Sequence, residues 1–219
     1  MVVETERFLF DGPAGALEAM LELPESLPAT PAAVAVVCHP HPQFQGTMLN
    51  KVVHTLARSA LDNGWPALRF NYRGVGKSEG NYDEGRGETD DALAACELMT
   101  ARFNAPLVLM GFSFGAGVSL RLASRNYPSN AISAVLSAAP PVGRLGVPDD
   151  LAITVPWLVI QGSADELVDA QLVKRWAEQQ SPTPELVMLD GVSHFFHGSL
   201  TVLRQHAVDF LHRADFSAR

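Results

Sequence analysis

The 219-residue sequence has few of the features that mark several large classes of protein. Its only cysteines are Cys38 and Cys96, and no Cys-x-x-Cys pair occurs, which excludes a disulfide framework and the usual cysteine metal sites. The formal net charge is -8, and the sequence has no cluster of lysine or arginine. Because nucleic acids and anionic membranes are bound through concentrated positive charge, we expect neither as a partner.

Long apolar runs are missing as well. No stretch approaches the roughly 18 residues that a membrane-spanning helix needs, and residues 1–7 lack the basic and apolar regions of a secretory signal. We therefore expect a soluble, cytoplasmic protein. Internal repeats are absent, and 47% of the residues are hydrophobic, which is enough to form a large core. The expectation is a single domain covering residues 1–219.

What the sequence does contain is an alternation of short apolar runs with longer helical patterns. Alternating residues at 7–10 and 16–23, around a turn-rich break, predict an antiparallel pair of strands. Runs that suit parallel strands buried on both faces follow at residues 32–38, 66–72, 107–110, 131–136, 156–160 and 185–189. Helical patterns lie at about residues 48–63, 88–102, 115–125, 170–180 and 199–213. The alternation predicts an α/β fold with a mostly parallel, doubly wound sheet, in which ligands bind beyond the carboxyl ends of the strands.

A serine lies at a sharp junction between one predicted strand and the next helix, within Gly111-Phe112-Ser113-Phe114-Gly115. Gly-x-Ser-x-Gly in this context is the pattern of a nucleophile elbow. Its small flanking residues permit a strained turn that raises the serine hydroxyl above the sheet. We predict Ser113 as a nucleophile. The backbone N–H of Phe114, at the start of the helix, is predicted to donate to an oxyanion.

An acid and a histidine follow the serine in the order nucleophile, acid, base. Asp165 lies in a turn at the end of a predicted strand, and His194 lies in the loop after the last predicted strand. We predict that His194 accepts and returns the serine proton while Asp165 orients the imidazole. Of the rival acids, Asp169 is better explained as a helix cap, and Asp190 is too close in sequence to His194 to face its ring.

The loop after the first parallel strand contains His39-Pro40-His41-Pro42-Gln43, in the place that normally supplies a second oxyanion donor. Prolines have no N–H, so the candidates are the backbone amides of His41 and Gln43, and we favour His41. Two nearby histidines also raise the question of a metal. A third ligand and a carboxylate cluster are missing, so we expect no metal site and no cofactor.

A glycine-rich segment further along the chain imitates a phosphate-binding loop. Residues 74–78 read Gly-Val-Gly-Lys-Ser, which matches the end of the motif. Asn71 stands where the motif needs its first glycine, and a helix-breaking loop follows Ser78 where a helix is required. Nucleotide binding is therefore not predicted.

Together these motifs resemble the α/β-hydrolase superfamily, and within it a group of small lidless bacterial serine hydrolases that is distantly similar to dienelactone hydrolases. The likeness extends from Ala32 to about Leu211. It rests on the histidine–proline loop, residues 46–48 and 50–53, residues 70–78, the serine elbow, Gly162 with Asp165, and Gly191 with His194. The resemblance implies a sheet of up to eight strands whose second strand is antiparallel.

The sequence departs from the resembled proteins at two positions. Gln45 stands where the lidless group usually has glycine, and Ser113 stands where dienelactone hydrolases have cysteine.

Lids in this superfamily are inserted between two strands that only residues 139–155 separate here, which are too few for a cap domain. The resemblance therefore implies an open cleft, and the substrate of dienelactone hydrolases is not carried over.

Aromatic residues near the predicted site are expected to line the open cleft: Phe44, Phe112, Phe114, Phe195 and Phe196. Such a cleft suits a small acyl group. The leading hypothesis is a serine carboxylesterase that cleaves small-molecule, short-chain esters through an acyl-enzyme. Thioesterase, peptidase and acyltransferase activities begin with the same step and stay open, as do a non-catalytic binding protein on the same scaffold and the oligomeric state.

Overall fold

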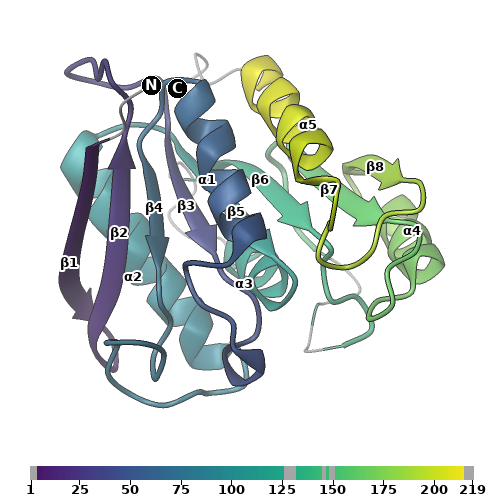
Figure 1. Cartoon of the computed structure of the whole chain (residues 1–219), viewed down its shortest axis with the longest axis horizontal. Coiled ribbons are helices and arrows are strands. Elements are labelled where there is room, and N and C mark those ends of the chain that lie inside the picture. The colour runs from purple at the N-terminus through teal and green to yellow at the C-terminus, as the bar shows by residue number, and fades with distance from the viewer. Residues whose placement is uncertain (1–3, 126–131, 145–146, 148–150, 215–219) are drawn as a thin grey trace.

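The computed structural model describes residues 4–125, 132–144, 147 and 151–214. Within them, eight strands form one sheet in the order β1-β2-β4-β3-β5-β6-β7-β8 (Figure 1). The strands are β1 (Glu4–Gly12), β2 (Gly15–Leu23), β3 (Val34–Cys38), β4 (Ala67–Phe70), β5 (Leu107–Phe112), β6 (Ile132–Ala138), β7 (Trp157–Gly162) and β8 (Glu185–Leu189). The helices are α1 (Lys51–Asp62), α2 (Arg86–Phe103), α3 (Phe114–Ala123), α4 (Ala170–Gln179) and α5 (Leu200–Arg213), with a short 3-10 turn, η1 (Pro42–Phe44).

The sheet is mostly parallel. Strand β2 pairs antiparallel with β1 and β4, and every pairing from β4 through β3 to β8 is parallel. Successive residues of a strand point to opposite faces. Val34 and Val36 of β3 accordingly join one core cluster, whereas Ala35 and Val37 join the other. The predicted α/β class, the doubly wound parallel sheet and the antiparallel second strand are confirmed.

Helices cover both faces of the sheet. Side chains of α2, α3 and α4 pack into the first core cluster, and those of α1 and α5 pack into the second, so that α1 and α5 lie together on the near side in Figure 1. Polar caps fix where two of these helices begin. Asn50 accepts from the N–H groups of Val52 and Val53 at the start of α1, and Asp169 caps α4, as its sequence position predicts.

Several predicted boundaries move by a few residues. The strand predicted at 66–72 ends at Phe70. The backbone N–H of Asn71 still donates to the carbonyl of Glu18 in β2, but the N–H of Tyr72 turns to the His39 ring in the loop after β3. The helix predicted at 48–63 begins only after its cap residue, Asn50. Residue 131, the first of another predicted strand, lies outside the described residues.

Strands β4, β3, β5, β6, β7 and β8 run parallel to one another, so their carboxyl ends lie along the same edge of the sheet. The loops after β3, β5, β7 and β8 therefore share one edge of the sheet. Between β6 and β7 the chain has only residues 139–156, too few for a separate cap domain. Within the described part of the chain, no helix has both the length and the apolar character to cross a bilayer.

Candidate active site

Ser113 lies at the junction of β5 and α3, in the place that its sequence context predicts. Its backbone has φ 54 and ψ −121. Residues other than glycine rarely adopt this conformation, so the surrounding structure must impose it. Close backbone packing imposes it here. A Cβ at Gly111 would overlap the backbone of Gly115, and a Cβ at Gly115 would overlap the carbonyl of Cys38. Both glycines of the motif are required by this packing.

The hydroxyl of Ser113 is the first member of a chain of hydrogen bonds. Its Oγ lies 3.0 Å from Nε2 of His194, whose Nδ1 lies 2.8 Å from Oδ2 of Asp165. The side chains of His194 and Asp165 are 2% and 0% exposed. A neutral imidazole donates from one nitrogen and accepts at the other. With Nδ1–H donated to Asp165, Nε2 is left to accept the serine proton. The structure thus brings together the three residues that the sequence predicts to act as nucleophile, base and acid.

The carboxylate of Asp165 is held from several sides. Its Oδ1 accepts the backbone N–H groups of Leu167 and Val168, both at 2.8 Å, and its Oδ2 also accepts Nε2 of Gln161 at 2.8 Å. Burial raises the pKa of Asp165, but the hydrogen bonds from His194 and from the backbone N–H groups outweigh it and hold the pKa below its ordinary value. Asp165 is therefore charged at neutral pH.

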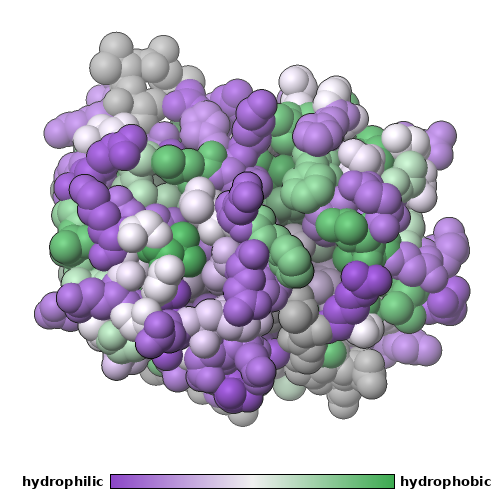
Figure 2. Space-filling view, turned by 60° about the horizontal axis from the view of Figure 1, so that its bottom comes forward, coloured by the Kyte–Doolittle hydropathy of each residue, from purple (hydrophilic) through white to green (hydrophobic). Residues whose placement is uncertain are grey.

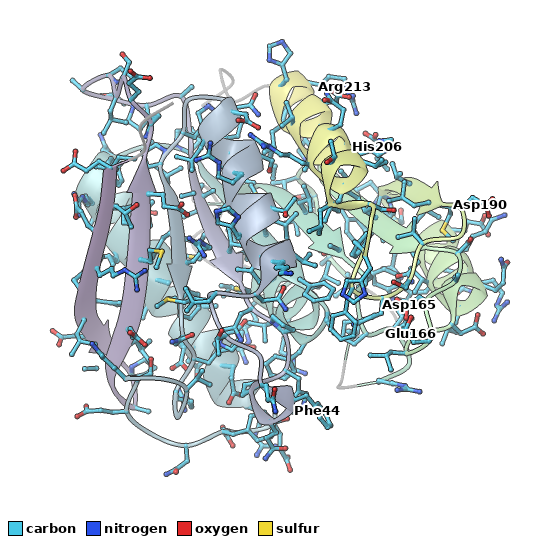
Figure 3. The ribbon with its side chains drawn as sticks, in the orientation of Figure 1. Phe44, Asp165, Glu166, Asp190, His206 and Arg213 are labelled. Carbon is cyan, nitrogen blue, oxygen red and sulfur yellow. The ribbon has the colours of Figure 1, made fainter. Side chains whose placement is uncertain are left out.

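The loop that carries His194 is tied to the loop that carries Asp165. The backbone N–H of His194 donates to Oε2 of Glu166 at 3.0 Å, and this bond lowers the pKa of the Glu166 carboxyl. Ser163 donates to Asp190 and accepts the N–H of Gly191 at 2.8 Å. In Figure 3, Asp190 lies well apart from the neighbouring Asp165 and Glu166 (Figure 3).

Sequence reasoning did not identify Glu166 or Gln161 as part of this site. The usable signals were weak: an acid immediately after Asp165, and one polar residue at the end of an apolar strand. Each acts on an atom contributed by a turn or loop, which the spacing of residues does not reveal.

His39 has a structural role in the loop after β3. Its Nδ1 lies 2.6 Å from the carbonyl of Pro40, and its Nε2 accepts the N–H of Tyr72 at 3.1 Å. Complete burial lowers the pKa of His39 to about 3, so the ring is neutral. Nε2 thus joins the end of β3 to the segment after β4, while Nδ1 is used within the loop after β3 itself.

His41 fixes the next part of that loop. Its Nδ1 accepts the N–H of Gln43 at 3.2 Å, and its Nε2 lies 3.1 Å from the hydroxyl of Tyr82. Burial lowers the pKa of His41, which favours the neutral ring with its proton on Nε2. Because the N–H of Gln43 is used in this way, His41 is the remaining candidate for a second oxyanion donor.

Residues at the end of the loop are anchored on the sheet. Met48 donates its N–H to Oδ1 of Asn71 at 2.9 Å, and its carbonyl accepts Nη1 of Arg69 at 2.8 Å. Arg69 in turn forms a buried ion pair with Glu22 at 2.8 Å. Gln45, which stands where the resembled group usually has glycine, has a left-handed backbone with φ 62, the region that favours glycine.

Three of the five aromatic residues predicted to line the cleft are buried. Phe112 and Phe196 are 0% exposed and belong to the core cluster beneath α1 and α5. Phe112 packs against the His194 ring from inside the protein, with ring centroids 5.2 Å apart. The prediction for both residues is wrong. At Phe112, an apolar strand buried on both faces gives no sign of which side chains reach its open end. At Phe196, in the loop after β8, the sequence does not show that Phe195 is exposed while its neighbour packs into the core. Phe114 is also buried, at 2% exposed.

Phe44 and Phe195 do lie at the surface, 81% and 39% exposed. Phe44 packs on His41, and Phe195 packs edge-on against His194 with ring centroids 5.1 Å apart. Figure 2 brings this end of the molecule forward and shows apolar surface among hydrophilic surface near the middle of the face and to its right (Figure 2). The large exposed apolar side chains on the loops after β3, β7 and β8 are Phe44, Leu49, Leu167 and Phe195.

The chain is similar to known proteins in both sequence and structure. A family profile described as the alpha/beta hydrolase fold matches residues 41–152. A crystal structure from Xanthomonas campestris, described as an α/β serine hydrolase without lid, is 41% identical, covers 96% of this chain and 94% of its own, and has a TM-score of 0.87. An α/β serine hydrolase homologue from Coxiella burnetii is 40% identical, with coverages of 94% and 97% and a TM-score of 0.84. An uncharacterized protein of Rickettsia prowazekii is 37% identical over 85% of this chain and 80% of its own.

The chain therefore belongs to the α/β hydrolase family. Within that family it shares the lidless form of the Xanthomonas campestris serine hydrolase.

Proposed function

We propose that this chain is a serine carboxylesterase that cleaves small, short-chain esters through an acyl-enzyme. The observation that carries the proposal is the hydrogen-bonded chain from the Ser113 hydroxyl through His194 to Asp165, with distances of 3.0 and 2.8 Å. A free serine hydroxyl is a weak nucleophile near neutral pH, and an adjacent, correctly oriented base is what activates it. The similarity to lidless serine hydrolases supports the same conclusion.

Acylation begins when the Ser113 Oγ attacks the ester carbonyl carbon while Nε2 of His194 accepts its proton. The charged Asp165 stabilises the resulting imidazolium through Nδ1–H. When the tetrahedral intermediate collapses, the bond to the alcohol oxygen breaks and Nε2–H returns the proton to that oxygen. Nε2 then accepts a proton from a water molecule, whose oxygen attacks the acyl carbon. The bond between that carbon and Ser113 Oγ breaks, Nε2–H returns the proton to Oγ, and the acid is released. Water is the only co-substrate, and no step uses a cofactor.

Two backbone donors are proposed to bind the oxyanion. The N–H of Phe114 is at the first position of α3, where helix geometry provides no intrahelical acceptor and the helix dipole adds partial positive charge. The N–H of His41 is the second, on the loop that Tyr82 and Gln43 hold in place. Donors fixed before the reaction stabilise developing charge without reorganisation.

The small substrate follows from the openness of the site. The connection between β6 and β7 has only residues 139–156, too few for a cap domain that would enclose a long chain. Phe44 and Phe195 offer exposed apolar surface on loops at the same edge of the sheet, which suits a short acyl or alcohol group. A small-molecule ester is the proposed partner.

Hydrolysis of p-nitrophenyl acetate and butyrate tests the proposal. The wild-type protein is expected to release p-nitrophenol with saturable kinetics. Ser113→Ala is expected to lower kcat by about 10⁶-fold, the scale found when a serine protease loses its nucleophile. Failure of the wild-type protein to hydrolyse either ester, or retention of its rate in the variant, would contradict the proposal.

A further inference from the structure

Gln161, the next-to-last residue of β7, is a fully buried polar side chain against the carboxylate of Asp165. Its Nε2 donates to Oδ2 of Asp165 at 2.8 Å and lies 3.3 Å from the carbonyl of Gly162. The chemistry fixes which way the amide points. Turned about, its oxygen would face the carboxylate, and two acceptors at that distance repel each other.

The oxygen of the same amide makes no comparable hydrogen bond. Among the described residues, Oε1 of Gln161 is buried without a hydrogen-bond partner. A buried polar atom left unpaired destabilises a fold, and an apolar side chain at this position would avoid the penalty. The bond to Asp165 is the contact that only a donor at this position can make.

We propose that Gln161 is a positioning residue that orients the carboxylate of Asp165 and, through it, the imidazole of His194. The inference rests on the proposed function, since it assigns a task within that site. Oδ2 receives Gln161 Nε2 and His194 Nδ1, each at 2.8 Å, while Oδ1 is held by two backbone N–H groups. With Gln161 in place, the remaining acceptor direction of Oδ2 faces Nδ1–H.

Gln161→Met removes the donor and keeps a side chain of similar length. The carboxylate then turns more freely, and kcat is expected to fall about 10- to 100-fold, the scale for small misplacements of catalytic groups. Loss of a donor also concentrates negative charge on Oδ2, which stabilises the imidazolium more strongly. The acid limb of kcat/KM is therefore expected to move to higher pH.

Gln161→Glu is the conservative variant that separates positioning from packing. A protonated glutamic acid can donate to Oδ2, so at low pH the variant is expected to retain much of the rate that the wild-type protein has at the same pH. An ionised one repels Asp165, so activity is expected to fall as the pH rises and the shared proton is lost. A residue that merely fills space would give the same fractional loss at every pH.

Gln180 offers a matched control. It is also a buried glutamine, 3% exposed, but it lies at the end of α4, where its amide donates to the carbonyl of Trp176 and accepts the N–H of Leu151. Gln180→Met is expected to lower Tm without changing the pH profile. If folded Gln161→Met keeps the wild-type kcat and profile, or if both Gln161 variants show the pH-independent loss expected of a packing defect, the inference is overturned.

A spectroscopic readout tests the inference even if the ester proves not to be a substrate. The NMR signal of the His194 Nδ1 proton is expected to shift or broaden in Gln161→Met and to stay unchanged in Gln180→Met. An unchanged signal in Gln161→Met would overturn the positioning role. Absence of hydrolysis by the wild-type protein, with the signal shifted in the variant, would contradict only the proposed function.

Discussion

At the scale of single residues, the site depends on a few backbone and hydrogen-bonding requirements. Ser113 has a positive φ that the packing of Gly111 and Gly115 imposes, and this much is predictable from Gly-x-Ser-x-Gly after an apolar strand. The acid and base roles of Asp165 and His194 were equally predictable, from their order after the serine. Gln161 was not, because its donor bonds to an atom in the turn beyond its own strand, and nothing in its immediate sequence marks that bond.

Asp165→Asn tests the role of the acid. The asparagine has the same shape, but its amide no longer stabilises an imidazolium and favours the wrong tautomer of His194. We expect kcat toward p-nitrophenyl acetate to fall by about 10⁴-fold with Tm little changed. Asp169→Asn serves as the control, because asparagine caps a helix as well as aspartate does. Equal kcat values for Asp165→Asn and the wild-type protein would contradict the assigned role.

At the scale of elements, the strands and helices follow from the sequence, whereas their ends follow from contacts between segments. The strand predicted at 66–72 stops at Phe70, and the N–H of Tyr72 donates to His39 in the loop after β3 and not to a neighbouring strand. The turn η1 was not predicted, since its cap depends on the His41 side chain accepting the N–H of Gln43. The same limit explains the error at Phe112: periodicity identifies a buried strand but not the direction of each side chain at its end.

The contact between β3 and the segment after β4 makes stability depend on pH. Burial lowers the pKa of His39 from its ordinary 6.5 to about 3, so the unfolded chain binds a proton that the folded chain does not. This contribution to stability is complete above pH 6.5 and is lost as the pH falls toward 3, at up to about 1.4 kcal/mol per pH unit.

Urea unfolding at pH 7 and pH 5 measures that loss. His39→Gln keeps a donor and an acceptor but cannot titrate, so its unfolding free energy is expected to change less between the two pH values than that of the wild-type protein. Comparing the two proteins cancels the titration of all other groups. The same pH dependence in both would contradict the role given to His39.

The anchor of the loop after β3 can be tested through its ion pair. Glu22→Leu leaves the guanidinium of Arg69 buried without its carboxylate, and we expect a loss of about 3–5 kcal/mol in unfolding free energy. The double variant Glu22→Leu with Arg69→Met replaces the pair by apolar side chains and is expected to recover most of that loss. A double variant as unstable as the single one would show that the pair itself carries the stability.

At the scale of the whole molecule, the parallel sheet explains how distant residues meet. Because β3, β5, β7 and β8 run in the same direction, the loops that carry His41, Ser113, Asp165 and His194 all emerge at one edge. This arrangement was predictable from the alternation of strands and helices and from the family resemblance. The substrate was not, since the exposed apolar side chains that would contact it vary in direction with the loops that carry them.

Reaction with a fluorophosphonate, followed by intact mass and peptide mapping, tests the central claim most directly, because only an activated serine is phosphonylated rapidly. The account predicts a single adduct on Ser113, its absence in Ser113→Ala, and much slower labelling in His194→Ala. No adduct on the folded wild-type protein, or an adduct that persists in Ser113→Ala, would contradict it.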